Sequence, residues 1–284
     1  MRILITGASG FLGRRAAVFF EKEGYTVLAP THAQLDITDA AAVECWFAEN
    51  RPEAVLHCAA ISDTGACQKE PERTAKINVD GSINLAKAAA EIGAKFVFCS
   101  SDQVYAGSAK PGPHGEDEPL TPGNVYAVQK RLAEERCTEV CPSTVSLRLS
   151  WMYATDITPN EHGHLMASLP AAIRDETKTI SWPVYDRRGI TDVAEVVKNL
   201  PLALNLPAGV YNFGAENDSS THDTMEKVIK ELGKEDVLSR VTPNLQAFAD
   251  APRDIRMDTA KSESFGIKFS TTTEGLVEAL RRVL

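Results

Sequence analysis

The chain has 284 residues, of which 43% are hydrophobic and 24% are charged, as in an ordinary soluble globular protein. Its 30 Lys and Arg residues against 39 Asp and Glu residues give a formal net charge of −9, and no basic run occurs in the sequence. This balance excludes a nucleic acid or an anionic membrane surface as an expected partner.

The sequence shows no sign of a membrane span, a signal peptide or a disulfide framework. No apolar stretch approaches the length of a span. The N-terminal run "MRILITGASGFLG" is short, breaks into glycines and precedes Arg14 and Arg15, an order that does not fit a signal peptide. Cys137 and Cys141 have the spacing of half a metal site, but no second pair of Cys or His completes it. We expect a cytoplasmic protein without a metal.

Short β-rich runs alternate with amphipathic helical stretches through the first half of the chain. The predicted strands are 2–6, 25–29, 54–60, 95–101 and 144–150. The predicted helices are 11–22, 39–50, about 72–92 and the one that carries Tyr126 and Lys130. Nearly continuous apolar strands that alternate with helices predict an α/β fold, a doubly wound parallel sheet covered on both faces.

The pattern loosens after Trp151, where we expect a smaller lobe over residues 151–284 that returns some elements to the sheet. Its predicted elements are a polar loop at 154–164, a helix at 165–175 interrupted near Pro170, a helical stretch at 188–204 with Thr191 or Asp192 as N-cap, a strand at 209–214, a capped helix at 219–233 and a closing helix at 271–284.

A glycine turn follows the first predicted strand at once. Gly7, Gly10 and Gly13 form G-x-x-G-x-x-G between this strand and an amphipathic helix. Glycines let the backbone turn tightly and approach a pyrophosphate, which then lies against the N–H groups of a helix N-terminus. This context predicts a Rossmann-type NAD(P)-binding domain over residues 1–150.

The residues after the second strand bear on which dinucleotide binds. NAD sites usually offer a carboxylate there for the ribose 2′-hydroxyl. This chain has "VLAPTHAQLD", with His32 and no carboxylate before Asp36. Arg14 and Arg15 follow the last glycine and are candidates for a 2′-phosphate, unless they are only solvent-facing helix residues. NADP is therefore the preferred cofactor, with NAD as the alternative.

Several motifs occur in the order typical of one family. They are the glycine turn, "LDITD" (35–39), "NVDGSINLAKAAAEIGAKFVFCSSDQVYAG" (78–107), "NVYAVQK" (124–130), "RLSWMY" (148–153) and "PRDIRMDTAKSESFGI" (252–267). Over nearly its whole length the chain resembles the extended short-chain dehydrogenase/reductase family, and within it the dTDP-4-dehydrorhamnose reductase branch.

The resemblance implies a catalytic role for three residues. Tyr126 would donate a proton to a substrate carbonyl, Lys130 would hold the nicotinamide ribose, and Ser101 would hydrogen-bond the same carbonyl oxygen. Tyr126 and Lys130 are four positions apart, on one face of a helix. A free phenol has a pKa of about 10, so we expect a nearby cation, Lys130, to lower the pKa of Tyr126.

The resemblance also implies which residues contact the cofactor. Asp36 and Ile37 would flank the adenine, Ala59 and Ala60 would line the passage beside the cofactor, and Asn78 would lie near the nicotinamide. The remaining expected cofactor contacts are Gly7, Ser9, Gly10, Phe11, Leu12, Gly13, Arg14, His32, Cys58, Ser100, Tyr126 and Lys130.

The expected substrate contacts are Ser101, Asp102, Gln103, Trp151, Arg187 and Arg188. Dehydratases of the family carry Asp-Glu where this chain has Asp102-Gln103, and an amide cannot exchange that proton, so dehydration is disfavoured. Trp151 either lines the substrate mouth or packs beneath the cofactor. Arg187 and Arg188 either grip a diphosphate or belong to a solvated loop.

Two stretches depart from the branch where the sugar would bind, "DTGACQKEP" (63–71) and "NEHGHLM" (160–166), which leaves the sugar undefined. His162 and His164 lie in the second stretch, and two histidines in a polar loop are more often without a function than part of a metal site. Three hypotheses follow: an NADPH-dependent reductase of a nucleotide-linked 4-keto-deoxysugar, a nucleotide-sugar epimerase with tightly held NAD, and a non-catalytic NADP-binding regulatory subunit like the methionine adenosyltransferase β subunit. The resemblance further suggests a homodimer paired through two long helices.

Overall fold

The computed structural model describes residues 1–156 and 165–284. Its centre is a six-stranded sheet in the order β10-β5-β4-β3-β1-β2, with every neighbouring pair parallel. The strands are β1 (Arg2–Thr6), β2 (Thr26–Leu28), β3 (Ala54–His57), β4 (Lys95–Ser101), β5 (Val145–Leu149) and β10 (Gly209–Phe213). The predicted doubly wound α/β fold is confirmed. Its strand order reverses direction between β1 and β3, where such sheets bind ligands beyond the carboxyl ends of the strands.

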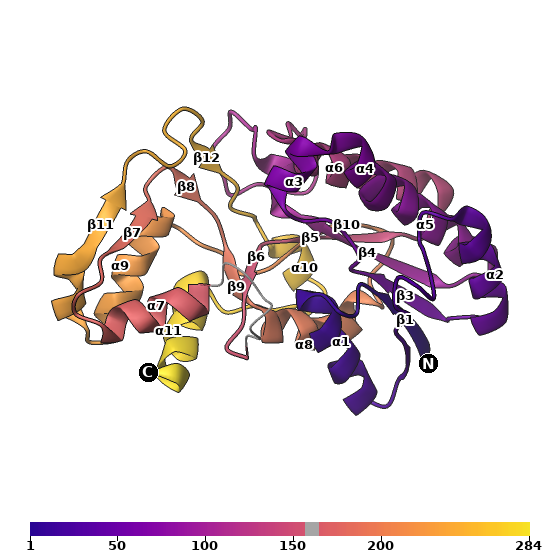
Figure 1. Ribbon diagram of the computed structural model, residues 1–284, viewed down its shortest axis with the longest axis horizontal. Coiled ribbons are helices and arrows are strands. Elements are labelled where there is room, and N and C mark those ends of the chain that lie inside the picture. Colours follow the sequence, from indigo (N-terminus) through magenta and orange to yellow (C-terminus); the bar gives the residue numbers. More distant parts are fainter. Residues whose placement is uncertain (157–164) are drawn as a thin grey trace.

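Helices cover both faces of this sheet (Figure 1). α1 (Phe11–Lys22) and α8 (Val193–Ala203) lie on one face, and α2 (Ala40–Asn50), α5 (Gly81–Glu91) and α6 (Val125–Val140) lie on the other. Successive strand residues point to opposite faces, so Ile3 and Ile5 pack with α1 while Leu4 packs with α2 and α5. This alternation separates two cores and explains why the strands are apolar throughout.

The C-terminal lobe has a core of its own. Its helices are α7 (Leu165–Arg174), α9 (Thr221–Glu231) and α11 (Thr272–Val283), with the strand pair β7 (Ile180–Pro183) and β11 (Val241–Asn244). Two short parallel pairs lie between the lobe and the large sheet (Figure 1): β6 (Trp151–Tyr153) with β9 (Ile190–Asp192), and β8 (Asp186–Arg187) with β12 (Arg253–Asp254). β10 and α8 return to the large sheet. A short helix, α10 (Ala260–Glu263), packs against β10.

Two helix predictions need correction. The stretch predicted as one helix over 72–92 divides into α4 (Pro71–Ala75), a π-helical turn (Lys76–Asp80) and α5, and the preceding α3 (Thr64–Lys69) was not predicted. In the π-helical turn the Asn78 side chain is bonded to both the N–H and the C=O of Ile61, which ties this turn to the chain after β3.

The second correction concerns α7, which continues through Pro170 because its apolar residues, including Leu169 and Ile173, are buried in the lobe core. The predicted loop over 154–164, with His162 and His164, lies largely outside the described residues. Of the helices that the structure describes, none combines the length and apolar character that a bilayer crossing requires.

The core between α1 and the sheet should dominate stability. Phe20 is completely buried and meets Tyr25 edge-on, with 4.8 Å between ring centroids. We expect Phe20→Ala to lower the free energy of unfolding by about 3–5 kcal/mol, measured by urea denaturation. Val18→Ala, in the same helix but 51% exposed, should change it by less than about 0.5 kcal/mol. Equal losses in the two variants would contradict this account of the core.

Candidate active site

The glycine turn leaves no room for side chains where the chain leaves β1. Gly7 has a φ of +67°, and a Cβ there would lie 2.7 Å from the backbone nitrogen of Ala59. A Cβ on Gly13 would lie 2.2 Å from the carbonyl oxygen of Gly7. The N–H of Gly10 donates to that oxygen at 2.9 Å, and α1 begins at Phe11. A bare backbone turn opening into a helix N-terminus fits a dinucleotide pyrophosphate. Ser9 lies in this turn and Leu12 in the first turn of α1, and their contact with the cofactor remains a prediction.

The two arginines after the turn differ in exposure. Arg15 has a side chain 8% exposed, lies 4.2 Å over the Phe11 ring and donates through Nε to Asp156 at 2.9 Å. The Arg14 side chain is 30% exposed and donates to the carbonyl oxygen of Asp156 at 2.9 Å. Arg14 is therefore the more accessible candidate for a phosphate group, whereas the Arg15 side chain is largely buried and paired with Asp156.

The predicted adenine end lies beyond β2. His32 is exposed, and Ile37 is buried with its side chain against Gly81. Asp36 accepts hydrogen bonds from the backbone N–H and the hydroxyl of Thr38, at 2.9 and 2.8 Å. These bonds lower the pKa of Asp36. The Asp36 carboxylate thus stabilises a turn, and its contact with adenine remains a prediction.

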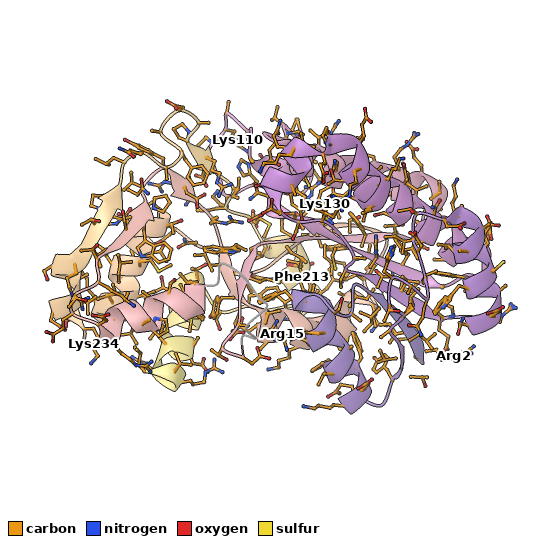
Figure 2. All side chains as sticks on the ribbon, in the orientation of Figure 1. Arg2, Arg15, Lys110, Lys130, Phe213 and Lys234 are labelled. Carbon is orange, nitrogen blue, oxygen red and sulfur yellow. The ribbon has the colours of Figure 1, made fainter. Side chains whose placement is uncertain are left out.

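Ser101, Tyr126 and Lys130 come together at the carboxyl end of β4. Ser101 ends this strand, and α6 starts after Asn124, whose side chain caps the helix by accepting from the N–H of Ala127 at 2.9 Å. The three residues are 8%, 8% and 3% exposed. Lys130 Nζ donates to the Cys99 carbonyl oxygen at 2.8 Å and lies 5.8 Å from the centre of the Tyr126 ring. Figure 2 shows Lys130 in the central part of the molecule, far from Lys234 in the C-terminal lobe.

Burial determines the protonation of this cluster. It raises the pKa of Tyr126 above its ordinary value, the Asp102 carboxylate adds to the increase, and a hydrogen bond with Ser101 opposes it. Burial likewise lowers the pKa of Lys130. The expectation that Lys130 lowers the pKa of Tyr126 is therefore wrong, because burial raises this pKa instead. The phenol is held in its neutral form, which is the form that can donate a proton.

His57 and Gln129, which the sequence analysis did not single out, support this edge of the sheet. His57 lies between the hydroxyls of Thr6 (Nδ1···Oγ1 2.7 Å) and Ser82 (Nε2···Oγ 2.9 Å), and so connects β1, β3 and α5. The Nδ2 group of Asn78 donates to the side chain of Gln129 at 2.8 Å, which links the π-helical turn to α6. The only sequence signal for this role of His57 was that it is the one polar residue in the apolar run "AVLHCAA".

The other predicted cofactor residues lie at the carboxyl ends of β3 and β4. The sulfur atoms of Cys58 and Cys99 are 3.6 Å apart, and the N–H of Ala59 donates to Thr6 Oγ1 at 3.3 Å. Ala60 follows, partly exposed. Ser100 is buried, and its hydroxyl has no hydrogen-bond partner among the described residues. These residues surround the same end of the sheet as the glycine turn.

On the predicted substrate side, the two arginines of "DRRG" have different environments. Arg188 is buried, donates through Nη2 to Asp102 Oδ2 at 2.8 Å and lies 5.4 Å over the Trp151 ring. It is therefore not a loop residue in solvent, and its contact with a diphosphate remains a prediction. Arg187 is only partly buried, in β8.

Arg253, which was not predicted, also reaches this region. It donates to Gln103 Oε1 at 3.3 Å and, through Nε, to Asp186 Oδ1 at 2.6 Å. The strand pair β8–β12 thus brings a second guanidinium to the residue after Asp102. The sequence offered no signal for this contact, because Arg253 and Gln103 are 150 positions apart.

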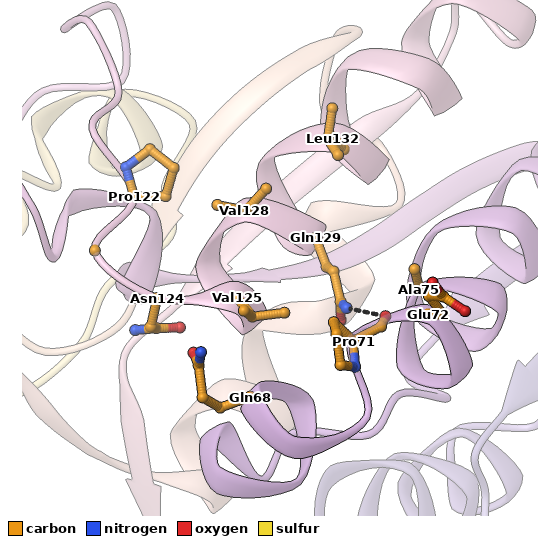
Figure 3. Close-up of a pocket in the computed structure, with 11 residues that line it drawn as sticks. Gln68, Pro71, Glu72, Ala75, Pro122, Asn124, Val125, Val128, Gln129 and Leu132 are labelled. Carbon is orange, nitrogen blue, oxygen red and sulfur yellow. Dashed lines mark hydrogen bonds between the residues drawn. The ribbon is translucent and has the colours of Figure 1, made fainter.

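A groove of about 570 Å³ lies beside this cluster, on the outer side of α6 (Figure 3). Its lining includes Pro71 on α4 and Val125, Val128 and Leu132 on α6, and Gln129 crosses it to donate to the Pro71 carbonyl oxygen at 3.0 Å. Ser101, Tyr126 and Lys130 do not line it. We therefore place the candidate active site at the sheet edge and not in this groove.

The fold and this cluster of residues define an extended short-chain dehydrogenase/reductase. Over residues 1–284 the sequence matches the family described as RmlD substrate binding domain, and the chain belongs to that family. It is 31% identical over 277 residues to the dTDP-4-dehydrorhamnose reductase of Streptomyces griseus, across 94% of this chain and 88% of that protein.

Two further similarities are to a protein of another name and to a solved structure. The chain is 26% identical over 281 residues to the methionine adenosyltransferase 2 subunit beta of Pongo abelii, across 94% of this chain and 83% of that protein. The crystal structure of Bacillus anthracis dTDP-4-dehydrorhamnose reductase in complex with NADP shares the fold, with a TM-score of 0.84 at 24% identity over 100% of this chain and 99% of that chain.

The burial of His57 makes stability depend on pH. Burial, aided by Lys130, lowers the pKa of His57 to about 3, against about 6.5 for a histidine in the unfolded chain. Between these values the unfolded chain binds a proton that the folded protein does not. Stability is therefore full above about pH 6.5 and falls towards about pH 3, by up to about 1.4 kcal/mol per pH unit.

We expect His57→Gln to reduce this slope, measured as the free energy of unfolding from urea titrations at a series of acidic pH values. The exposed His32→Gln variant serves as the control and should keep the wild-type slope. An unchanged slope in His57→Gln would show that other groups cause the acid sensitivity.

Proposed function

We propose that this chain is an NADPH-dependent reductase of the C4 ketone of a nucleotide-linked deoxysugar, similar to dTDP-4-dehydrorhamnose reductase. The observation that carries the proposal is the cluster of Ser101, Tyr126 and Lys130 at the carboxyl edge of the sheet, with a buried phenol whose raised pKa keeps it neutral. Membership of the family and the 31% identity to the Streptomyces griseus reductase support the substrate class.

NADPH, when bound, supplies the hydride. The Tyr126 phenol donates a hydrogen bond and then its proton to the ketone oxygen, and the Ser101 hydroxyl donates a second hydrogen bond to the same oxygen. An ammonium group has three N–H donors, and Lys130 uses one for the Cys99 carbonyl oxygen, so the others are suited to the ribose hydroxyls of the cofactor. The Gly7–Gly13 turn holds the pyrophosphate, and Asn78 supports the nicotinamide side through its bonds to Ile61 and Gln129.

A regulatory role is the second candidate, and the similarity to the methionine adenosyltransferase 2 subunit beta favours it. A buried Ser101, Tyr126 and Lys130 would also suit a subunit that only binds NADP. Dehydration remains disfavoured, because Gln103 cannot exchange a proton and its carbonyl oxygen accepts from Arg253 and Asn124. Turnover distinguishes these roles.

We expect Tyr126→Phe to lower kcat for ketone-dependent NADPH oxidation by about 10²- to 10⁴-fold, because the general acid is lost. Ser101→Ala should lower kcat by about 10²-fold or more. The assay follows NADPH absorbance with a panel of nucleotide 4-keto sugars. Tyr25→Phe is the control, since this tyrosine packs against Phe20 below the sheet.

Other outcomes of this assay would refute the reductase. No turnover with any keto sugar, together with co-purification of a methionine adenosyltransferase, would support the regulatory role. Nucleotide retained through purification and interconversion of sugar epimers without net NADPH oxidation would support the epimerase.

Cofactor preference provides a separate test at the glycine turn. We expect NADPH to bind more tightly than NADH, and Arg14→Gln to weaken NADPH by about 10- to 100-fold through the loss of a charged hydrogen bond to the 2′-phosphate. NADH affinity should stay within twofold. Binding is measured by quenching of intrinsic fluorescence, with Lys22→Gln at the far end of α1 as the control. Equal weakening of both cofactors would remove Arg14 from the 2′-phosphate site.

A further inference from the structure

The Asp102 carboxylate is shared between two groups of the candidate site. Its Oδ2 accepts from Arg188 Nη2 at 2.8 Å, and its Oδ1 accepts from the Ser101 hydroxyl at 3.2 Å. An ordinary O–H···O bond is about 2.7–2.8 Å long, so Arg188 has the firm hold on the carboxylate and Ser101 the loose one. Asp102 is 1% and Arg188 9% exposed, so water competes little for either group.

Arg188 is itself held firmly. Its guanidinium lies 5.4 Å over the Trp151 ring, and its backbone oxygen accepts a hydrogen bond from Asn217 Nδ2 at 2.9 Å. Arg188 comes directly after strand β8. Its Nε is buried without a hydrogen-bond partner among the described residues. Burying two charges and leaving a donor unsatisfied is a poor way to gain stability. A role at the neighbouring Ser101 therefore explains this ion pair better than a gain in stability does.

We propose that Arg188 is a positioning residue for the reduction: by holding Asp102, it keeps the carboxylate from capturing the Ser101 hydroxyl, which stays available to the substrate ketone. The inference rests on the proposed function of Ser101. It also replaces the expected diphosphate contact of Arg188 with a role one residue away from the reacting oxygen. Without Arg188, the Asp102 carboxylate would turn its full charge to the nearest remaining donor, and Ser101 is that donor among the contacts described.

The test is a set of double variants assayed for ketone-dependent NADPH oxidation. Arg188→Met should lower kcat by about 10- to 100-fold, because the freed Asp102 carboxylate then holds the Ser101 hydroxyl in a charge-assisted hydrogen bond of that strength. The NADPH dissociation constant should stay unchanged within twofold. In the Ser101→Ala background, Arg188→Met should cause no further loss. Asp102→Asn combined with Arg188→Met should restore kcat to within about threefold of wild type, since the trapping carboxylate is gone.

A merely structural ion pair gives different results. Arg188→Met and Ser101→Ala would then lower kcat independently, and Asp102→Asn would restore nothing; either result overturns the inference. Arg256→Met is the matched control, because Arg256 forms a similar ion pair with Asp254 at 2.6 Å, with side chains 13% and 15% exposed, and touches none of the three catalytic candidates. It should lower stability but leave kcat within twofold.

Further variants distinguish a failure to fold from a failure of the inference. If Arg188→Met alone does not fold, the charge-neutral Asp102→Asn/Arg188→Met variant and Arg188→Lys take its place: near wild-type kcat in both supports the inference, and a 100-fold loss in the double variant overturns it. If unaltered protein reduces no keto sugar, the proposed function fails. The hold of Arg188 is then decided by crystal structures of the variants. An Arg188→Met structure with the Ser101–Asp102 distance still at 3.2 Å overturns the inference, and a shortened contact there supports it. Arg188→Lys keeps a cation at this position and should retain the 3.2 Å distance.

Discussion

The ammonium of Lys130 is removed almost completely from water and bonded to a strand carbonyl, and much of the candidate site depends on this placement. The Cys99 carbonyl oxygen fixes α6 against β4, and the Phe98 ring lies 4.7 Å from the ammonium. One helical turn earlier, Tyr126 is carried to the end of the same strand beside Ser101. The buried charge also contributes to the low pKa of His57 across the sheet. Lys130 thus helps to position α6, lies near the Tyr126 phenol and helps to keep His57 neutral.

The C-terminal lobe is connected to this cluster by guanidinium groups. Arg188 reaches Asp102 and Arg253 reaches Gln103, so two neighbouring residues after β4 are each contacted from the strand pair β8–β12 or from the turn that follows it. Arg253 is in turn bonded to Asp186. Both links are hydrogen bonds of fixed direction rather than apolar contacts, so the lobe and the edge of the sheet are held in one relative orientation at the site.

The sequence predicted the large sheet because its strands are apolar on both faces and its helices have clear caps, such as Asp39 for α2 and Asp192 for α8. Glycine spacing and the Tyr126–Lys130 spacing are local patterns, and both lead to the observed cluster. The break at Asn78 and the short strands β8 and β12 depend on partners distant in the sequence, and no local periodicity signals them. The surroundings of Arg188 could not be predicted for the same reason. Its dipeptide suggested an exposed phosphate contact, but its environment is set by Asp102, 86 residues away.

The closeness of Gly7 and Gly13 limits how the proposed cofactor site can change its choice of dinucleotide. With a Cβ position on Gly13 only 2.2 Å from the Gly7 oxygen, the turn admits a single backbone path, and no replacement side chain there can reach towards the ribose. Under the proposed function, a change between NADP and NAD would therefore arise from substitutions around the turn, at Arg14 in α1 or in the loop after β2. Side chains can vary at the rim of the turn, while the close approach of Gly13 to the Gly7 oxygen fixes the backbone between them.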